Sequence, residues 1–170
     1  MMTLIRNWCM AVGDMPSSIA LRESSVAYPA TETVHVVMLI LFLGLVVMMD
    51  LRLAGIGNKG TPITQIQKRL FPWQMAGMAI ISISGAILVF ADPMRFYGNL
   101  FFRVKLVLLG LAGINALTFH FTTYNSVAAW DTDPKPPFGA RLAGGVSLAI
   151  WSLIVVTGRL IAYNWFEPIQ

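Results

Sequence analysis

The chain contains few charged residues and a single cysteine. Asp, Glu, Lys and Arg make up 12% of its 170 residues, against about 25% in an average soluble domain. So few charges do not cover the surface of a soluble globule, and a hydrophobic fraction of 56% excludes a disordered chain. Cys9 alone excludes an internal disulfide and every cysteine-based zinc or iron–sulfur site. The composition therefore favours a protein that lies in the lipid bilayer.

Common signatures of catalysis and of nucleic-acid binding are also missing. The sequence contains no P-loop, H-E-x-x-H, G-x-S-x-G or C-x-x-C motif. The net charge is +4, but the Lys and Arg residues stand singly between apolar runs and form no basic stripe. We therefore expect a protein that is not an enzyme and that has no nucleic-acid partner.

Long uncharged stretches dominate what is present. Four of them contain no Asp, Glu, Lys or Arg: residues 33–49, 70–91, 106–130 and 142–158. Each approaches or exceeds the ~20 residues that cross ~30 Å of hydrocarbon as a helix. The sequence therefore predicts an all-α integral membrane protein, a four-helix transmembrane bundle within residues 33–166. The helices are expected at about 33–53, 70–91, 101–124 and 140–165.

The segment 1–32 has the features of an amphipathic interfacial region. Apolar residues recur there at helical spacing: Leu4, Ile5, Trp8 and Val12. Polar and breaking residues at 13–18 interrupt the apolar run that a signal peptide needs, so we expect no cleavage. One or two short helices lying on the membrane surface are predicted.

The connections and the aromatic residues suggest an orientation. The loop 51–69 is the most basic hydrophilic loop and is expected in the cytoplasm, which places both termini in the periplasm. The prolines of 131–139 predict a stiff linker. The tryptophans are expected to form an interfacial belt: Trp8, Trp73, Trp130, Trp151 and Trp165.

Small-residue pairs predict the helix-packing seams: Ser82 with Ala86, Ala112 with Ala116, Ala140 with Gly144, and Gly145 with Ala149.

Polar side chains gather in two clusters when the predicted helices are laid antiparallel. The outer cluster comprises Glu32, His35, Asp92, Arg95, Arg103, Lys105 and Arg159. The inner cluster comprises Asp50, Arg52, Trp73, Gln74, Asn115, His120 and Arg141. Because burying such groups in lipid is costly, each cluster is a candidate functional site. The cations of the outer cluster suit an anionic or acceptor group, such as a lipid phosphate, a quinone oxygen, a cofactor propionate or an acidic patch of a partner. The alternative is a network of ion pairs that fixes helix register.

Haem and metal binding are further alternatives. His35 and His120 are the two histidines, and their depths in the bundle differ by about 15–20 Å. One haem b iron is therefore not held by both histidines. A haem iron held by one histidine and a methionine of another helix stays an alternative. Glu32 and His35 form an E-x-x-H pair on one helix face, to which Asp92 could add a third metal ligand. Methionines are soft ligands for copper.

Several short motifs resemble a known group of proteins. They are Glu32-Thr-Val-His35, Asp50-Leu-Arg-Leu53 and Gly158-Arg-Leu-Ile-Ala-Tyr163. Their order resembles an uncharacterised family of small four-helix bacterial inner-membrane proteins. That resemblance implies a bacterial inner-membrane location and a family feature at Glu32 and His35, but no activity. The hydropathy and the first histidine-bearing helix are more weakly similar to the membrane part of copper-resistance D proteins, which implies copper handling.

Together these observations predict a non-enzymatic integral subunit or accessory of a larger bacterial inner-membrane assembly, respiratory or redox. Its expected partners are bound lipid, other integral membrane proteins or a second copy of the chain. The alternative is a small haem- or copper-binding protein for electron transfer or metal handling.

Overall fold

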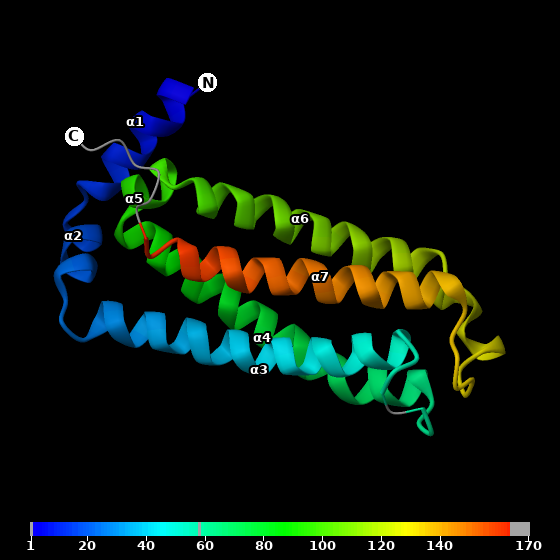
Figure 1. Ribbon diagram of the computed structural model, residues 1–170. Coiled ribbons are helices and arrows are strands. Elements are labelled where there is room, and N and C mark those ends of the chain that lie inside the picture. Colours follow the sequence, from blue (N-terminus) through cyan, green and yellow to red (C-terminus); the bar gives the residue numbers. More distant parts are fainter. Residues whose placement is uncertain (1, 58, 164–170) are drawn as a thin grey trace.

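The computed structural model describes residues 2–57 and 59–163, and all its regular elements in this part are helices (Figure 1). Their order is α1 (Met2–Gly13), α2 (Pro16–Glu23), α3 (Ala27–Leu53), α4 (Ile63–Ala91), α5 (Pro93–Gly98), α6 (Leu100–Phe121), the 3₁₀ helix η1 (Tyr124–Ala129) and α7 (Phe138–Leu160). Four of them, α3, α4, α6 and α7, are long and apolar enough to cross a membrane. The four-helix, all-α fold class predicted from the sequence is therefore confirmed.

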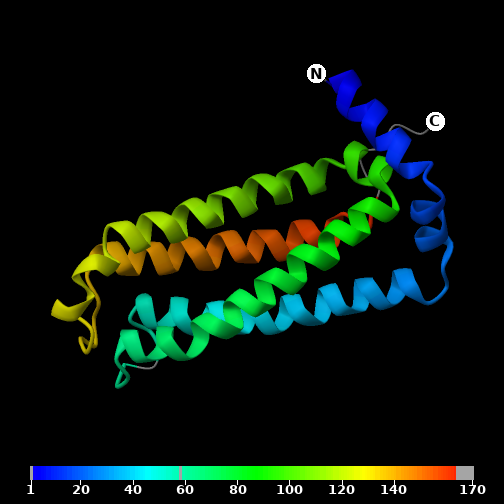
Figure 2. The ribbon, with the colours of Figure 1, turned by 180° about the vertical axis from the view of Figure 1, so that it is seen from behind.

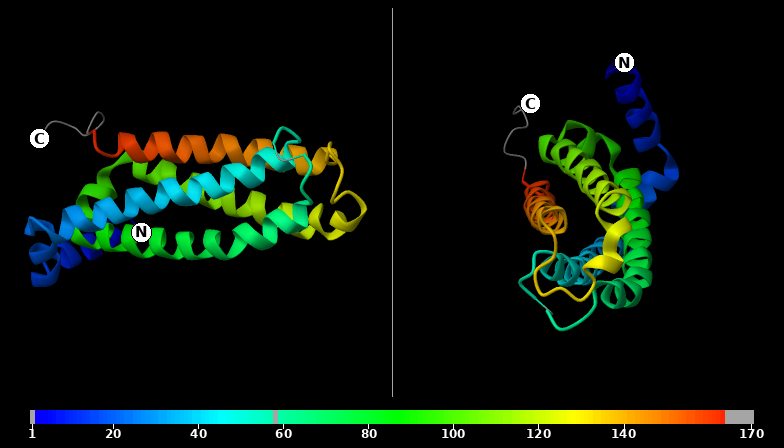
Figure 3. Two further views of the ribbon diagram at one scale, coloured as in Figure 1. Left: turned by 90° about the horizontal axis from the view of Figure 1, so that it is seen from below. Right: turned by 90° about the vertical axis from the view of Figure 1, so that its right-hand side faces the viewer.

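The four long helices form an open arc. α3 packs against α4 and α7, and α7 packs against α6, whereas α4 and α6 scarcely touch. An end-on view shows the resulting order α6, α7, α3 and α4 around the bundle (Figure 3). The opposite view shows α4 crossing the bundle obliquely (Figure 2). We call the end that carries α1, α2 and α5 the outer end and the other the inner end.

Close helix contacts occur where glycine leaves room. A Cβ atom on Gly144 of α7 would lie 2.7 Å from the carbonyl oxygen of Asp50 in α3, and one on Gly77 of α4 would lie 3.3 Å from the Cβ of Phe42. The predicted Ala140–Gly144 seam is therefore confirmed. The predicted Ser82–Ala86 and Gly145–Ala149 seams are wrong, since these residues are exposed.

Two helices are longer than the apolar runs suggested. α3 begins at Ala27, and α4 runs without a break from Ile63 through Pro72 to Ala91. Helical backbone satisfies its own hydrogen bonds, so a helix continues beyond the hydrocarbon until a cap or breaker ends it. α6 ends earlier than expected, at Phe121, and η1 follows it. Residues 164–166 of the expected domain, including Trp165, lie outside the described residues.

One fully buried side chain organises the inner end. Arg52 of α3 has no exposed surface. Its Nε donates to the carbonyl oxygen of Thr61 at 3.0 Å, and its Nη2 donates to those of Asp131 and Asp133 at 3.2 and 3.1 Å. Arg52 thereby ties the 54–62 connection to the linker after η1.

The N-terminal segment is fixed to the outer end. Ser18 of α2 is buried, and its hydroxyl lies 2.9 and 3.1 Å from the carbonyl oxygens of Phe90 and Ala91, the last residues of α4. These carbonyls belong to the last turn, where the helix itself offers no donors. α1 packs against α5, with Gly13 beside Pro93. The predicted amphipathic segment is thus two helices, the second of which caps α4.

Candidate functional site

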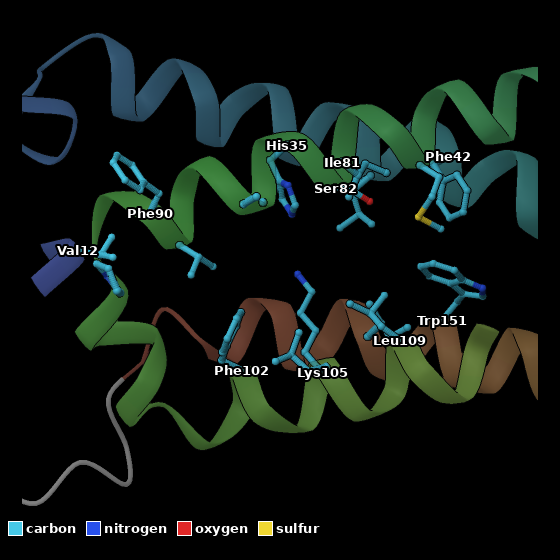
Figure 4. Close-up of a pocket in the computed structure, with 18 of the residues that line it drawn as sticks. Val12, His35, Phe42, Ile81, Ser82, Phe90, Phe102, Lys105, Leu109 and Trp151 are labelled. Carbon is cyan, nitrogen blue, oxygen red and sulfur yellow. The ribbon is translucent and has the colours of Figure 1, made fainter. Parts of the chain in front are cut away.

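A cavity of about 450 Å³ lies in the outer half of the bundle (Figure 4). Its walls come from α3, α4, α6 and α7, and Trp8 and Val12 of α1 contribute at its outer end. α4 and α6 both line it but scarcely touch each other. Its volume falls within the ~300–1,000 Å³ typical of small-molecule sites.

His35 of α3 lines one wall and is held by α4. Its Nδ1 lies 3.0 Å from the hydroxyl oxygen of Ser84, and that oxygen lies 2.7 Å from the carbonyl oxygen of Ile80. The direction of the hydrogen bond between His35 and Ser84 depends on the tautomer of the ring: Nδ1–H donates to the Ser84 oxygen, or Nδ1 accepts from the Ser84 hydroxyl. In the first tautomer Nε2 carries a lone pair, and in the second it carries a hydrogen that can be donated. Gly85 makes room for the ring, because a Cβ there would lie 3.1 Å from Cε1 of His35.

Lys105 of α6 lines the opposite wall and reaches toward His35 (Figure 4). It passes Gly158 of α7, where a Cβ would lie 3.6 Å from Nζ. Its ammonium has no hydrogen-bond or ion-pair partner among the described residues. A cation surrounded by apolar side chains is costly unless an acceptor or an anion joins it. The position of Lys105 therefore indicates a site for such a group.

The remaining lining is almost entirely apolar. Besides His35 and Lys105, its polar groups are the hydroxyl of Ser82 and the indoles of Trp8 and Trp151. No Asp or Glu among the described residues lines the cavity. The site therefore suits a neutral or anionic ligand with hydrogen-bond acceptors and a large apolar surface.

Most of the predicted outer cluster lies outside this cavity. Glu32 is exposed, and Asp92 caps α5 by accepting from the backbone amide of Arg95 at 3.3 Å. Arg103 donates to the carbonyl oxygen of Tyr97 and lies over its ring. Arg159 donates to the hydroxyl oxygen of Tyr163 at 3.1 Å.

The alternative prediction for the outer cluster was a network of ion pairs. Across residues 2–57 and 59–163, no acidic and basic side chains approach within 4.0 Å. Glu32 is exposed to solvent, and Asp92 caps a helix. The nearby bases Arg103 and Arg159 donate to a backbone carbonyl oxygen and to a tyrosine hydroxyl. Of the outer cluster, only His35 and Lys105 come together in the cavity.

The predicted inner cluster is not a single network. Gln74 donates to the carbonyl oxygen of Leu45 at 3.2 Å and joins α4 to α3. Asn115 donates to that of Ala143 at 3.0 Å and joins α6 to α7. Asp50 is buried, and its carboxyl group lies near the side chain of Ser147 in α7. These polar side chains therefore connect different pairs of helices.

Three other members of the inner cluster are exposed. They are Trp73, His120 and Arg141. His120 stacks on the ring of Tyr124, with centroids 5.6 Å apart, near the end of α6. It lies at the inner end, whereas His35 lies in the outer half, in agreement with the expectation that one haem iron is not held by both.

No metal cluster is formed in the part of the chain that the structure describes. Groups of three or more His, Cys, Asp or Glu side chains with metal-binding geometry do not occur there. Glu32 and His35 share a helix, but only His35 lines the cavity.

Comparison with known proteins assigns the chain to a family. Residues 21–164 match DUF6644, which is described as a family of unknown function. The chain belongs to this family. Among curated proteins and solved structures, no significant match is found. The DUF6644 region covers all four long helices and the end of α2, and therefore includes both His35 and Lys105.

The sequence did not reveal the aromatic part of the DUF6644 cavity. Trp151 was expected at the membrane interface, but it is buried, with 8% of its surface exposed, and its ring packs edge-on against Phe42 at 5.0 Å. Its position near the middle of the uncharged stretch 142–158 was the available signal, because interfacial tryptophans lie near the ends of spans. Trp8 likewise lies at the cavity.

Proposed function

We propose that this protein is a non-enzymatic integral membrane protein that holds a lipid-soluble ligand between His35 and Lys105. In this proposal it acts as a subunit or accessory of a larger assembly of the bacterial inner membrane, with both termini in the periplasm. The observation that carries the proposal is the unpaired ammonium of Lys105 facing His35 inside an apolar cavity. An empty site would leave this cation without a partner, and a ligand with an acceptor supplies one.

The access route supports a ligand that arrives from the bilayer. α4 and α6 line the cavity, scarcely touch each other and carry apolar exposed side chains, so we place the entrance between them. Trp8 and Val12 of α1 lie at the outer end, on the side of the aqueous phase. A molecule dissolved in the membrane therefore meets the opening directly.

The shape of the chain supports an accessory role. Nearly all of the described residues belong to helices or short connections, and these residues form no separate extramembrane domain. α6 has no buried residue, which leaves a broad apolar face for lipid or for helices of another subunit. Purification in mild detergent is expected to recover stable partner proteins, and a partner-free, monodisperse preparation from native membranes would contradict the accessory role.

A cavity-filling variant tests ligand binding. Ala86 is exposed and lines the cavity, whereas Ala79 is exposed on the same helix and does not line it. Native mass spectrometry and solvent extraction of the detergent-purified protein are expected to reveal a bound lipid-soluble molecule. Ala86→Trp is expected to lose it and Ala79→Trp to retain it. A wild-type protein that remains ligand-free after incubation with native lipid extract would overturn the proposal.

A haem- or copper-binding protein is the second candidate. The lone pair on Nε2 of neutral His35 is a suitable axial ligand, and Lys105 would pair with a haem propionate. An absorption spectrum with parallel metal analysis of the purified protein separates the candidates. A Soret band or stoichiometric copper that disappears in His35→Ala at unchanged expression supports this second function. A colourless, metal-free protein rejects it.

A further inference from the structure

We infer that the ligand of this cavity is a quinone, whose planar ring lies between His35 and Lys105 with one carbonyl oxygen directed toward each. The inference rests on the proposed function and names the ligand class. It concerns binding alone and requires no electron transfer within this chain.

The placement of the two polar side chains carries the inference. His35 enters from α3 and Lys105 from α6, so they face each other across the cavity (Figure 4). Apolar side chains line the space on both sides of this pair. Phe90 and Phe102 lie toward the outer end, and Trp151 lies toward the inner end (Figure 4). A complementary ligand has polar atoms on two opposite edges and apolar surface elsewhere, which describes a para-quinone ring.

The hydrogen-bonding capacity of the pair fits both forms of such a ring. Lys105 is a donor only, so it requires a carbonyl or phenolate oxygen. Ser84 holds Nδ1 of His35. One neutral tautomer presents the lone pair of Nε2 to a quinol hydroxyl, and the other presents Nε2–H to a quinone carbonyl. One fixed donor and one group that takes either role match a quinone better than a ligand with two permanent anionic oxygens.

A lipid with a single polar head fits the same cavity less well. A fatty acid or a phospholipid carries its polar atoms at one end, so complementary side chains converge on one point near the aqueous phase. Here the polar pair lies deeper than Val12 and Phe90, with apolar walls on either side (Figure 4). The aromatic side chains Phe42, Phe102 and Trp151 also offer flat surfaces to a ring. The opening between α4 and α6 leaves a path for an isoprenoid tail into the bilayer.

Binding of chosen probes to the full chain in phosphatidylcholine nanodiscs tests the inference. Decylubiquinone, palmitate and phosphatidylglycerol are titrated separately, and saturable binding beyond that of empty nanodiscs is measured by calorimetry. We expect decylubiquinone to bind most tightly. Lys105→Met and His35→Leu are each expected to weaken it about tenfold, the effect of losing one hydrogen bond to a charged or strongly polar group. Arg103→Met, on the same helix but outside the cavity, is the matched control and is expected to bind as the wild type.

A spectroscopic measurement on the wild type avoids dependence on variants. The infrared carbonyl bands of decylubiquinone labelled with ¹³C at one carbonyl are expected to shift to lower frequency on binding, because both oxygens accept hydrogen bonds. The two carbonyls are expected to shift unequally, since one meets an ammonium and the other an imidazole.

The outcomes separate the ligand class from the proposed function. Tighter binding of palmitate or phosphatidylglycerol, abolished by Ala86→Trp, would overturn the quinone and leave a lipid-soluble ligand in place. Quinone binding that Lys105→Met and His35→Leu leave unchanged, with unshifted carbonyl bands, would also overturn the inference. Absence of saturable binding for all three probes, together with no co-purified molecule in the extraction experiment, would overturn both.

Discussion

The carboxylate of Asp131 accepts two hydrogen bonds from Thr64, one from its backbone amide at 2.8 Å and one from its hydroxyl at 2.6 Å. Thr64 lies in the first turn of α4, and the backbone carbonyl oxygen of Asp131 accepts a further bond from the amide of Ile63 at 3.1 Å. The linker after η1 thus supplies the N-terminal cap of a helix that lies far away in the sequence. A carboxylate at this place also interacts favourably with the helix dipole.

Removing the charge of this cap is expected to destabilise the fold. Asp131→Asn leaves one acceptor oxygen where the wild type uses two, so we expect a loss of about 1 kcal/mol in the free energy of unfolding near neutral pH. Asp133→Asn is the matched control, because Asp133 uses its backbone carbonyl oxygen rather than its carboxylate to bind Arg52. Equal loss in both variants, measured by thermal or denaturant unfolding in detergent, would contradict the capping role.

The same cap predicts a pH dependence. Desolvation by itself would raise the pKa of Asp131, but the hydrogen bonds from Thr64 and Ile63 and the charge of Arg52 hold this pKa below its ordinary value. The stabilising contribution is therefore complete above the unfolded-state pKa, about 3.9, and is lost as the pH falls through the folded-state pKa. Unfolding from pH 3 to pH 7 should show the difference between wild type and Asp131→Asn shrinking at the acid end. A constant difference would reject this assignment.

Gly144 and Gly145 make a matched pair for testing the contact of α7 with α3. Gly144→Ala would place a Cβ 2.7 Å from the carbonyl oxygen of Asp50, against backbone that does not move freely. We expect it to cost about 1–3 kcal/mol in stability. Gly145→Ala meets nothing within 4 Å and is expected to be neutral or stabilising by up to about 1 kcal/mol, since alanine favours helix. Reversible unfolding in mixed micelles measures both, and similar values would show that the helices are not packed as described.

Gly85 is expected to control the orientation of His35. A Cβ in Gly85→Ala would lie 3.1 Å from Cε1 of the imidazole, so the ring must shift, and its contact with Ser84 changes with it. Binding of the cavity ligand should then weaken several-fold while the melting temperature changes little, because the ring borders open space. Gly110→Ala on α6, where nothing lies within 4 Å, is the control. Unchanged ligand affinity in Gly85→Ala would separate His35 from binding.

Ser18 is expected to hold the N-terminal helices onto the bundle. Ser18→Ala removes the hydroxyl that donates at the end of α4 and leaves carbonyl oxygens of Phe90 and Ala91 without that donor. The loss is expected to be about 1 kcal/mol and local. Hydrogen exchange should become faster in α1 and α2 and remain unchanged in α3 and α7. Ser17→Ala, at an exposed position of the same helix, should leave exchange unchanged; faster exchange in both variants would point to general fraying of α2.

The sequence was sufficient for the number of spans and for one of the packing contacts. Long runs without charge predict membrane-crossing helices, since a charged side chain in hydrocarbon is costly and backbone there must satisfy its own hydrogen bonds. Ala140 and Gly144 were recognisable as a seam because two small residues four apart lie on one helix face. The depth of each polar residue also followed from its position along a span, which placed His35 and Lys105 at a similar level.

Only the tertiary structure decided which of these polar residues meet. The apolar residues of α3 and α6 favour no one side of the helix, so no hydrophobic periodicity in the sequence fixes how each helix is rotated about its axis. The rotation is set by close contacts, such as Gly77 against Phe42 and Gly85 against His35. It turns His35 and Lys105 into one cavity and leaves Glu32 and Arg103 outside. Composition and spacing thus determined that the chain forms four membrane-length helices. The rotation and the contacts of these helices decided where a ligand has room to bind, because they depend on shape complementarity between distant segments.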